Sequence, residues 1–138
     1  MSVLARFRSE SPFEVRDNAR KIEVRIIRLC MNEKYFPKRY RFIIVTDLID
    51  DAHKMVDYIE AANIIPLTED FHKKRVMYQK ESYIRIENIF RKLILAEELG
   101  FTIPEATLIE LGEALNKEES LIKNWIESDR TRIKQNKN

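Results

Sequence analysis

The chain has 138 residues, of which 44% are hydrophobic and 35% are charged. This length suits one domain with a single hydrophobic core, and the two glycines and four prolines argue against a β fold with many turns. The 25 basic residues nearly balance the 23 acidic residues, so the net charge of +2 does not by itself indicate nucleic-acid binding. The distribution of the charges along the chain has to decide that question.

The cellular compartment follows from features that the sequence lacks. The N-terminal MSVLARFRSESP has no apolar stretch of the length found in secretory signals. No apolar run approaches the roughly 20 residues needed to span a bilayer. Cys30 is the one cysteine, so the chain cannot form an internal disulfide, and a reducing compartment is the simpler expectation. We therefore expect a cytoplasmic protein without a membrane segment.

The first predicted helix spans residues 11–32. Ser11 is the expected N-cap, Pro12 the first helical residue, and Glu14 the acid of a capping box. Helical spacing gives the helix an inner face made of Val15, Ala19, Ile22, Ile26 and Leu29. The same spacing places four basic residues on its outer face, namely Arg20, Lys21, Arg25 and Arg28.

A second helix is predicted over residues 38–62, because Pro37 forces the preceding residue out of the helical conformation. Its apolar stripe consists of Ile44, Leu48, Ala52, Met55, Val56 and Ile59, and Ile43, Val45 and Ile49 widen this stripe.

The longest predicted helix lies between Thr68 and Gly100. About 31 helical residues would extend roughly 46 Å. Thr68 is the expected N-cap, Gly100 is expected to adopt the left-handed conformation that closes a helix, and Phe101 is expected to fold back onto the last turn. Its apolar stripe consists of Ile86, Ile89, Phe90, Leu93 and Ile94.

A fourth helix is predicted to start at Thr102-Ile103-Pro104-Glu105, again a cap followed by an early proline and a glutamate. Its stripe runs from Ile109 and Leu111 through Leu115, Leu121, Ile122, Trp125 and Ile126. After Ser128 the sequence is polar, and we expect this tail to fray.

Four amphipathic helices with short connections predict an all-α fold, an antiparallel up-down-up-down four-helix bundle. The expected organisation is a flexible basic segment over residues 1–10, the bundle over 11–128 and a polar tail over 129–138. The apolar stripes of the second and fourth helices are wider than one seam requires, which leaves self-association through the excess face open.

Catalytic and metal-binding patterns give little support for an enzyme. Bundles can hold two metal ions with Glu-x-x-His pairs, and Glu69 with His72 has this spacing, as does Asp50 with His53 in carboxylate form. The two histidines, however, are expected at depths that differ by roughly 7 Å along the bundle. There is no Gly-rich phosphate loop, no paired Cys/His zinc spacing and no nucleophile elbow. We expect no catalytic residues, no metal and no cofactor.

Several segments resemble one known family. They are the turn Phe36-Pro37-Lys38-Arg39-Tyr40-Arg41-Phe42, the helix ends Ala61-Ala62-Asn63 and 93–99, and the late Leu121-Ile122 and Trp125-Ile126 pattern. Over roughly residues 22–128 the chain is similar to the small four-helix-bundle proteins that include the ribosomal intervening-sequence proteins and the accessory variability determinant (Avd) of diversity-generating retroelements. The resemblance implies a homopentamer with a positively charged surface. In the retroelement members that surface engages a reverse transcriptase and its template RNA.

The predicted function is therefore that of a non-catalytic, oligomeric accessory protein that presents basic residues to RNA or DNA and to a reverse transcriptase. Phosphates would be bound by basic side chains with release of counterions. The alternative is a structural or regulatory protein-binding module, encoded by a phage or mobile element, whose charged helix faces are only solvated. The candidate nucleic-acid-binding residues are Arg20, Lys21, Arg25, Arg28, Lys38, Arg39, Arg41, Lys73, Lys74, Arg75, Arg130 and Arg132.

Overall fold

The computed structural model describes residues 2–7 and 13–136, and within these residues it contains helices and no strand. The predicted all-α class is thus confirmed. Four α-helices carry the fold, with a short 3₁₀ helix before them and two short helical turns between the first and second. The elements are η1 (Leu4–Phe7), α1 (Glu14–Met31), η2 (Lys38–Tyr40), η3 (Arg41–Val45), α2 (Thr46–Ile64), α3 (Glu69–Glu98) and α4 (Glu105–Asn136).

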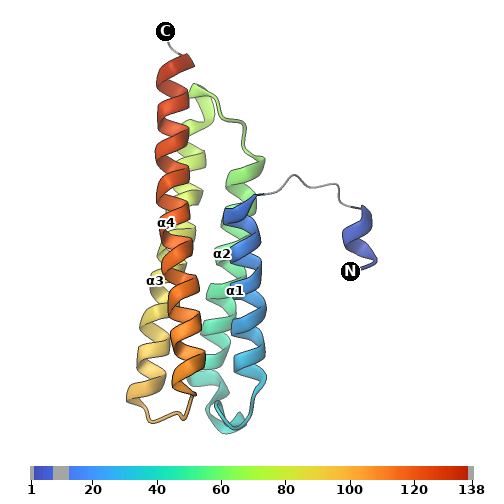
Figure 1. Cartoon of the computed structure of the whole chain (residues 1–138), viewed down its shortest axis with the longest axis vertical. Coiled ribbons are helices and arrows are strands. Elements are labelled where there is room, and N and C mark those ends of the chain that lie inside the picture. The colour runs from blue at the N-terminus through green and yellow to red at the C-terminus, as the bar shows by residue number, and fades with distance from the viewer. Residues whose placement is uncertain (1, 8–12, 137–138) are drawn as a thin grey trace.

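The four α-helices lie side by side, with their long axes close to a common direction (Figure 1). The α1–α2 and α3–α4 connections lie at one end of the molecule and the α2–α3 connection lies at the other. Contacts between α1 and α4 join Phe13 to Trp125, with ring centroids 5.0 Å apart, and Asn18 to Glu118. In these two contacts the earlier residue of the α1 side meets the later residue of α4.

The core is built by the residues that the apolar spacing selected. The predicted inner residues of α1 are all buried, as are Ile44, Leu48 and the other main members of the second stripe and Ile86, Ile89 and Leu93 of α3. Three residues of the predicted stripes were wrong, because Ile43 is 56% exposed and Ile94 and Ile109 are each 52% exposed. All three lie at the edge of their stripe, where the helix surface turns away from its neighbours.

The ends of α3 largely follow the sequence prediction. Thr68 is the N-cap residue with extended backbone, although its side chain makes no capping hydrogen bond. Gly100 has a φ of 86°, the left-handed region that glycine adopts without a steric penalty. The amide of Phe101 donates to the carbonyl of Ala96 at 3.0 Å, and its ring packs against the core. The chain is thereby turned into α4.

The segment after α1 departs from the continuous helix predicted from Lys38. Phe36 is buried and packs edge-on against Phe101, with ring centroids 5.5 Å apart. The chain then forms the 3₁₀ turn η2 and the π-helical turn η3 before regular α-helix begins at Thr46. The amide of Thr46 donates to the carbonyl of Arg41, five residues back, which is the π-helical spacing.

The C-terminal segment also differs from the prediction. The polar tail expected to fray after Ser128 continues as α4 to Asn136, and Asp129 and Ile133 are buried. The helix persists because these two side chains continue its inner face. The predicted cap Ser11 and first helical residue Pro12 lie outside the described residues, and α1 begins at Glu14 after Phe13. None of the helices that the structure describes is both long and apolar enough to cross a membrane.

Three carboxylates are buried between the helices, Asp51, Glu118 and Asp129, and the first two have contrasting partners. Asp51 of α2, 1% exposed, accepts hydrogen bonds from Arg85 at 2.9 Å and from Lys92, both on α3. Glu118 of α4 is fully buried and accepts a hydrogen bond from the Asn18 amide at 3.0 Å through one oxygen, while its other oxygen has no partner. Burial raises the pKa of Glu118 from 4.5 to about 8.

Candidate nucleic-acid interface

The outer face of α1 carries a row of solvent-facing cations. Lys21, Arg25 and Arg28 are exposed, and their spacing of four and three residues places them on one stripe of the helix. At 1.5 Å per residue the row extends about 10 Å along the helix axis. Together with Arg20 and the half-exposed Val24, these residues line a shallow surface groove of about 320 Å³.

Acidic side chains of the same helix are occupied elsewhere. Glu23 lies 2.9 Å from His53 of α2, and Glu14 forms an ion pair with Lys117 of α4 at 3.0 Å. Asp17 lies 3.8 Å from the neighbouring Arg16. Arg20 is the member of the basic group that contacts a carboxylate of another helix, with Glu60 at 3.5 Å. The positive charge of the row is thus directed to solvent.

An aromatic residue lies close to the same row. A second groove of about 290 Å³ runs between α1 and the start of α4, and its lining includes Arg25, Arg28 and Tyr35 from one side and Thr107 and Glu110 from the other. Two guanidinium groups beside a tyrosine can bind a phosphate and stack a base. The groove could not be found in the sequence, because the α1 and α4 residues that line it are far apart along the chain.

The basic residues of the α1–α2 connection form a separate group. Lys38, Arg39 and Arg41 are exposed at the end of the molecule where α1 leads into η2 and η3. Lys38 lies 3.3 Å from Glu33, and the Arg39 guanidinium stacks 4.9 Å from the centroid of the Tyr40 ring. This group is adjacent to the lower end of α1 (Figure 1).

A third group lies at the opposite end, where α3 begins and α4 ends (Figure 1). Lys73, Lys74, Arg130 and Arg132 are exposed there. Arg130 forms an ion pair with Glu127 at 2.9 Å. The structure therefore distributes the candidate residues over three places on the bundle and does not bring them together in one surface.

Arg75 does not belong to any of these surfaces. Its side chain is buried, and its guanidinium forms an ion pair with Asp129 of α4 at 2.7 Å. It also donates to the carbonyl oxygens of Ala62 at 3.2 Å and Ile65 at 2.8 Å, at the end of α2, where carbonyl groups run out of partners within the helix. The predicted role of Arg75 in phosphate binding was wrong, since the side chain joins α2, α3 and α4 inside the bundle.

A spacing signal could have revealed this role. The buried positions of α3 are Arg75, Gln79, Ser82, Ile86, Ile89, Leu93 and Ala96, which continue one alternation of four and three residues. The sequence prediction began the inner stripe at Ile86, its first apolar residue, and the polar residues that precede it in the same register were interpreted as surface. The run His72-Lys73-Lys74-Arg75 reinforced that reading because three of its four residues are indeed not buried.

The cysteine, the tyrosines and the possible metal ligands lie in surroundings that suit packing and not catalysis. Burial raises the pKa of the Cys30 thiol to about 12, which makes it a weak nucleophile at neutral pH. Tyr78 stacks on Tyr58 with ring centroids 6.0 Å apart, and Tyr40 packs against Phe101. Among the described residues, no three His, Cys, Asp or Glu side chains come together as a metal site would require.

No protein-family model, curated protein or solved structure matches this chain.

Proposed function

We propose that the chain is a non-catalytic accessory protein that binds RNA or DNA through the phosphate backbone, with the outer face of α1 as its contact surface. The observation that carries the proposal is the row of Lys21, Arg25 and Arg28, which faces solvent while the acids of the same helix are paired elsewhere. Such a row attracts phosphates and releases their counterions. Tyr35, beside Arg25 and Arg28, would add stacking on an exposed base.

The proposed architecture is an antiparallel up-down-up-down bundle. The inverse order of residue numbers in the α1–α4 contacts supports it, as does the pair Glu23–His53 together with Arg16–Glu60 between α1 and α2. The turn and helix-end segments described above resemble those of the Avd-like four-helix-bundle proteins in sequence. By that similarity we propose a cytoplasmic protein that acts as several identical copies and assists a reverse transcriptase.

The direct test is a comparison of two charge-reversed variants with equal change in net charge. K21E/R25E/R28E reverses the α1 row, and K73E/K74E/R132E reverses three exposed residues at the opposite end. Binding to a labelled single-stranded RNA is measured by fluorescence anisotropy at low salt. We expect the first variant to lose at least about tenfold more affinity than the second, since local phosphate contacts are lost in addition to net charge. Equal losses would contradict a specific role for α1.

A protein-binding module without nucleic-acid contact is the second candidate function. It is favoured by apolar side chains that face solvent, among them Phe42 at 89%, Met31 at 72% and Ile64 at 79% exposed. This function predicts that the wild-type chain is not retained on an immobilised RNA or DNA column even at low salt. Retention that disappears on raising the salt supports the phosphate-binding proposal instead.

A further inference from the structure

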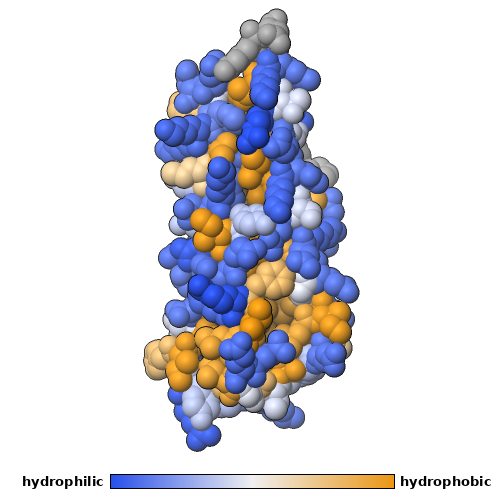
Figure 2. All heavy atoms as spheres, turned by 90° about the vertical axis from the view of Figure 1, so that its left-hand side faces the viewer, coloured by the Kyte–Doolittle hydropathy of each residue, from blue (hydrophilic) through white to orange (hydrophobic). Residues whose placement is uncertain are grey.

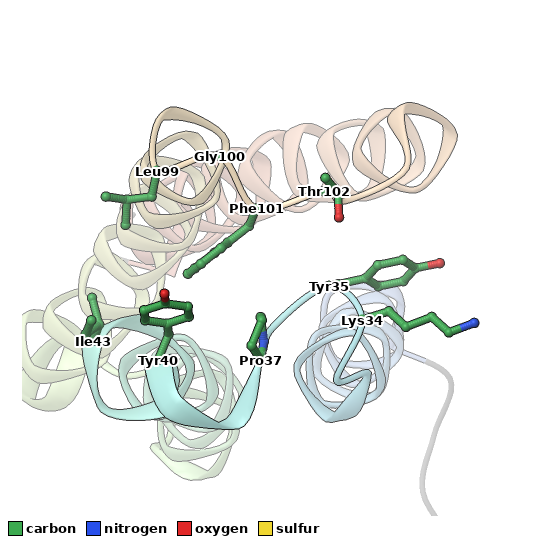
Figure 3. A pocket seen from close by; sticks show the side chains of 9 residues that line it. All are labelled: Lys34, Tyr35, Pro37, Tyr40, Ile43, Leu99, Gly100, Phe101 and Thr102. Atoms are coloured by element: carbon green, nitrogen blue, oxygen red, sulfur yellow. The ribbon is translucent and has the colours of Figure 1, made fainter.

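An apolar groove of about 400 Å³ lies at the end of the bundle where α3 stops. Tyr40 and Ile43 line it from the α1–α2 connection, and Leu99 and Phe101 line it from the α3–α4 connection (Figure 3). These four side chains face the gap between the two connections, whereas the Lys34 amine and the Tyr35 hydroxyl point away from it. The surface around this end is rich in apolar side chains (Figure 2), and Ile43 and Leu99 are 56% and 52% exposed.

The N-terminal helix η1 presents matching side chains to solvent. Val3, Leu4 and Phe7 are 64%, 77% and 81% exposed, and η1 lies apart from the four α-helices in Figure 1. Leu4 and Phe7 are three residues apart, which places them on one edge of a 3₁₀ helix. An exposed leucine and phenylalanine on one edge form a small apolar ridge that favours burial.

Charge also matches between this helix and the groove. η1 carries Arg6 and no acid. At the groove, α3 ends with Glu97 and Glu98, both exposed, and its last turn has no basic residue. Carboxylates at a helix C-terminus are unfavourable because the free carbonyl groups there carry partial negative charge. An arginine placed at this end would offset the charge of the two carboxylates and the partial charge of the free carbonyl groups.

Chain length indicates which copy supplies η1. Phe7 is six residues before Phe13, a distance of about 20 Å when fully extended. The groove lies beyond the far end of α1, which has 18 residues and is about 27 Å long. Phe7 therefore cannot reach the groove of its own chain. The length of the chain between Phe7 and Phe13 does not prevent Phe7 from reaching the groove of a neighbouring molecule.

We propose that η1 of one copy docks in the groove of a second copy, with Leu4 and Phe7 between Tyr40, Ile43 and Leu99 and with Arg6 beside Glu97 and Glu98. The contact links identical chains through a short arm. It goes beyond the proposed nucleic-acid binding and does not depend on it.

Disulfide trapping between two single variants tests the docking directly. F7C is mixed with L99C, each as the full chain and with a C-terminal tag on one of them, under mild oxidation. Cys30 stays in place because it is buried and its pKa is raised to about 12. The matched control mixes F7C with I64C, since Ile64 is 79% exposed at the opposite end of the bundle. Docking raises the effective concentration of the two thiols, so we expect the F7C–L99C product to form at least about tenfold faster than the control.

Equal rates in the two mixtures would overturn the proposal. The double variant F7C/L99C gives a second test. In dilute solution it should form disulfide-linked dimers and not an internal disulfide. An internal disulfide would show that η1 reaches the groove of its own chain and would contradict the proposal. Light scattering on concentrated protein completes the test. We expect L4S/F7S to lower the average mass relative to wild type and to I64S, whereas a monomeric wild type or an unchanged mass would contradict the arm exchange.

Discussion

Replacement of Arg75 by methionine should destabilise the bundle strongly. The change keeps an unbranched apolar stem but removes the guanidinium that bonds Asp129, Ala62 and Ile65. Asp129 is 1% exposed and would keep one donor, the Gln79 amide at 2.8 Å. Breaking a buried ion pair by removing one partner typically costs about 3–5 kcal/mol, because the other charge stays buried without compensation.

This loss is large in relation to the roughly 5–15 kcal/mol that stabilises a typical domain. The assay is urea denaturation followed by far-ultraviolet circular dichroism, with the unfolding free energy compared between R75M and K74M. Lys74 is the exposed neighbour of Arg75, and its replacement should change stability by no more than about 0.5 kcal/mol. A similar small change in R75M would refute the reasoning.

The double variant R75M/D129L separates the orphaned charge from the lost packing. When both members of a buried ion pair are replaced by apolar residues, stability is often recovered. We expect R75M/D129L to be more stable than R75M, although less stable than wild type because the Ala62 and Ile65 carbonyl groups remain without their donor. A double variant no more stable than R75M would show that the buried charge is not the cause.

Three further changes have defined outcomes. Burial raises the pKa of Glu118 to about 8, so folding favours its protonated form, and this contribution to stability is complete below about pH 4.5 and is lost as the pH rises through about 8. The unfolding free energy of wild type should therefore fall between these pH values, and that of E118Q should fall less, by up to a few kcal/mol. If the unfolding free energies of E118Q and wild type depend on pH in the same way, this reasoning is contradicted. A chain that ends at Ser128 should unfold at lower urea concentration than wild type, because it lacks buried Asp129 and Ile133; an unchanged midpoint would mean that the end of α4 is dispensable. D51N should lose about 1–3 kcal/mol in the same assay, since Arg85 and Lys92 would face a neutral amide, and a stability equal to that of D57N, at an exposed aspartate of the same helix, would contradict it.

The helices and their inner faces could be predicted because the apolar side chains that are buried recur in the sequence with the period of a helix. Ile22, Leu48 and Ile122 lie in the core as their spacing indicates. The same periodicity located the outer face of α1, since residues opposite a buried stripe face solvent. The left-handed Gly100 could be predicted because its conformation suits glycine and few other residues.

The parts that could not be predicted depend on contacts between distant segments. The helical spacing of α3 places Arg75 on the inner face, but its hydrogen-bond partners, Asp129 and the end of α2, could not be predicted because they are distant in the sequence. The same pairing keeps α4 helical past Ser128, where the polar composition indicated a frayed tail. Tyr35 lies beside Arg25 and Arg28 because the chain folds back after α1, so the groove is a product of tertiary structure.

The salt dependence of RNA binding tests the central claim most directly. For single-stranded nucleic acid, each phosphate neutralised by a basic side chain contributes about −0.7 to the slope of log affinity against log salt concentration. If Lys21, Arg25 and Arg28 each contact a phosphate, the variant K21E/R25E/R28E should have a slope shallower than wild type by about 2. The matched variant K73E/K74E/R132E should keep a slope close to that of wild type. Equal slopes for wild type and the α1 variant would contradict the assignment of α1 as the nucleic-acid interface.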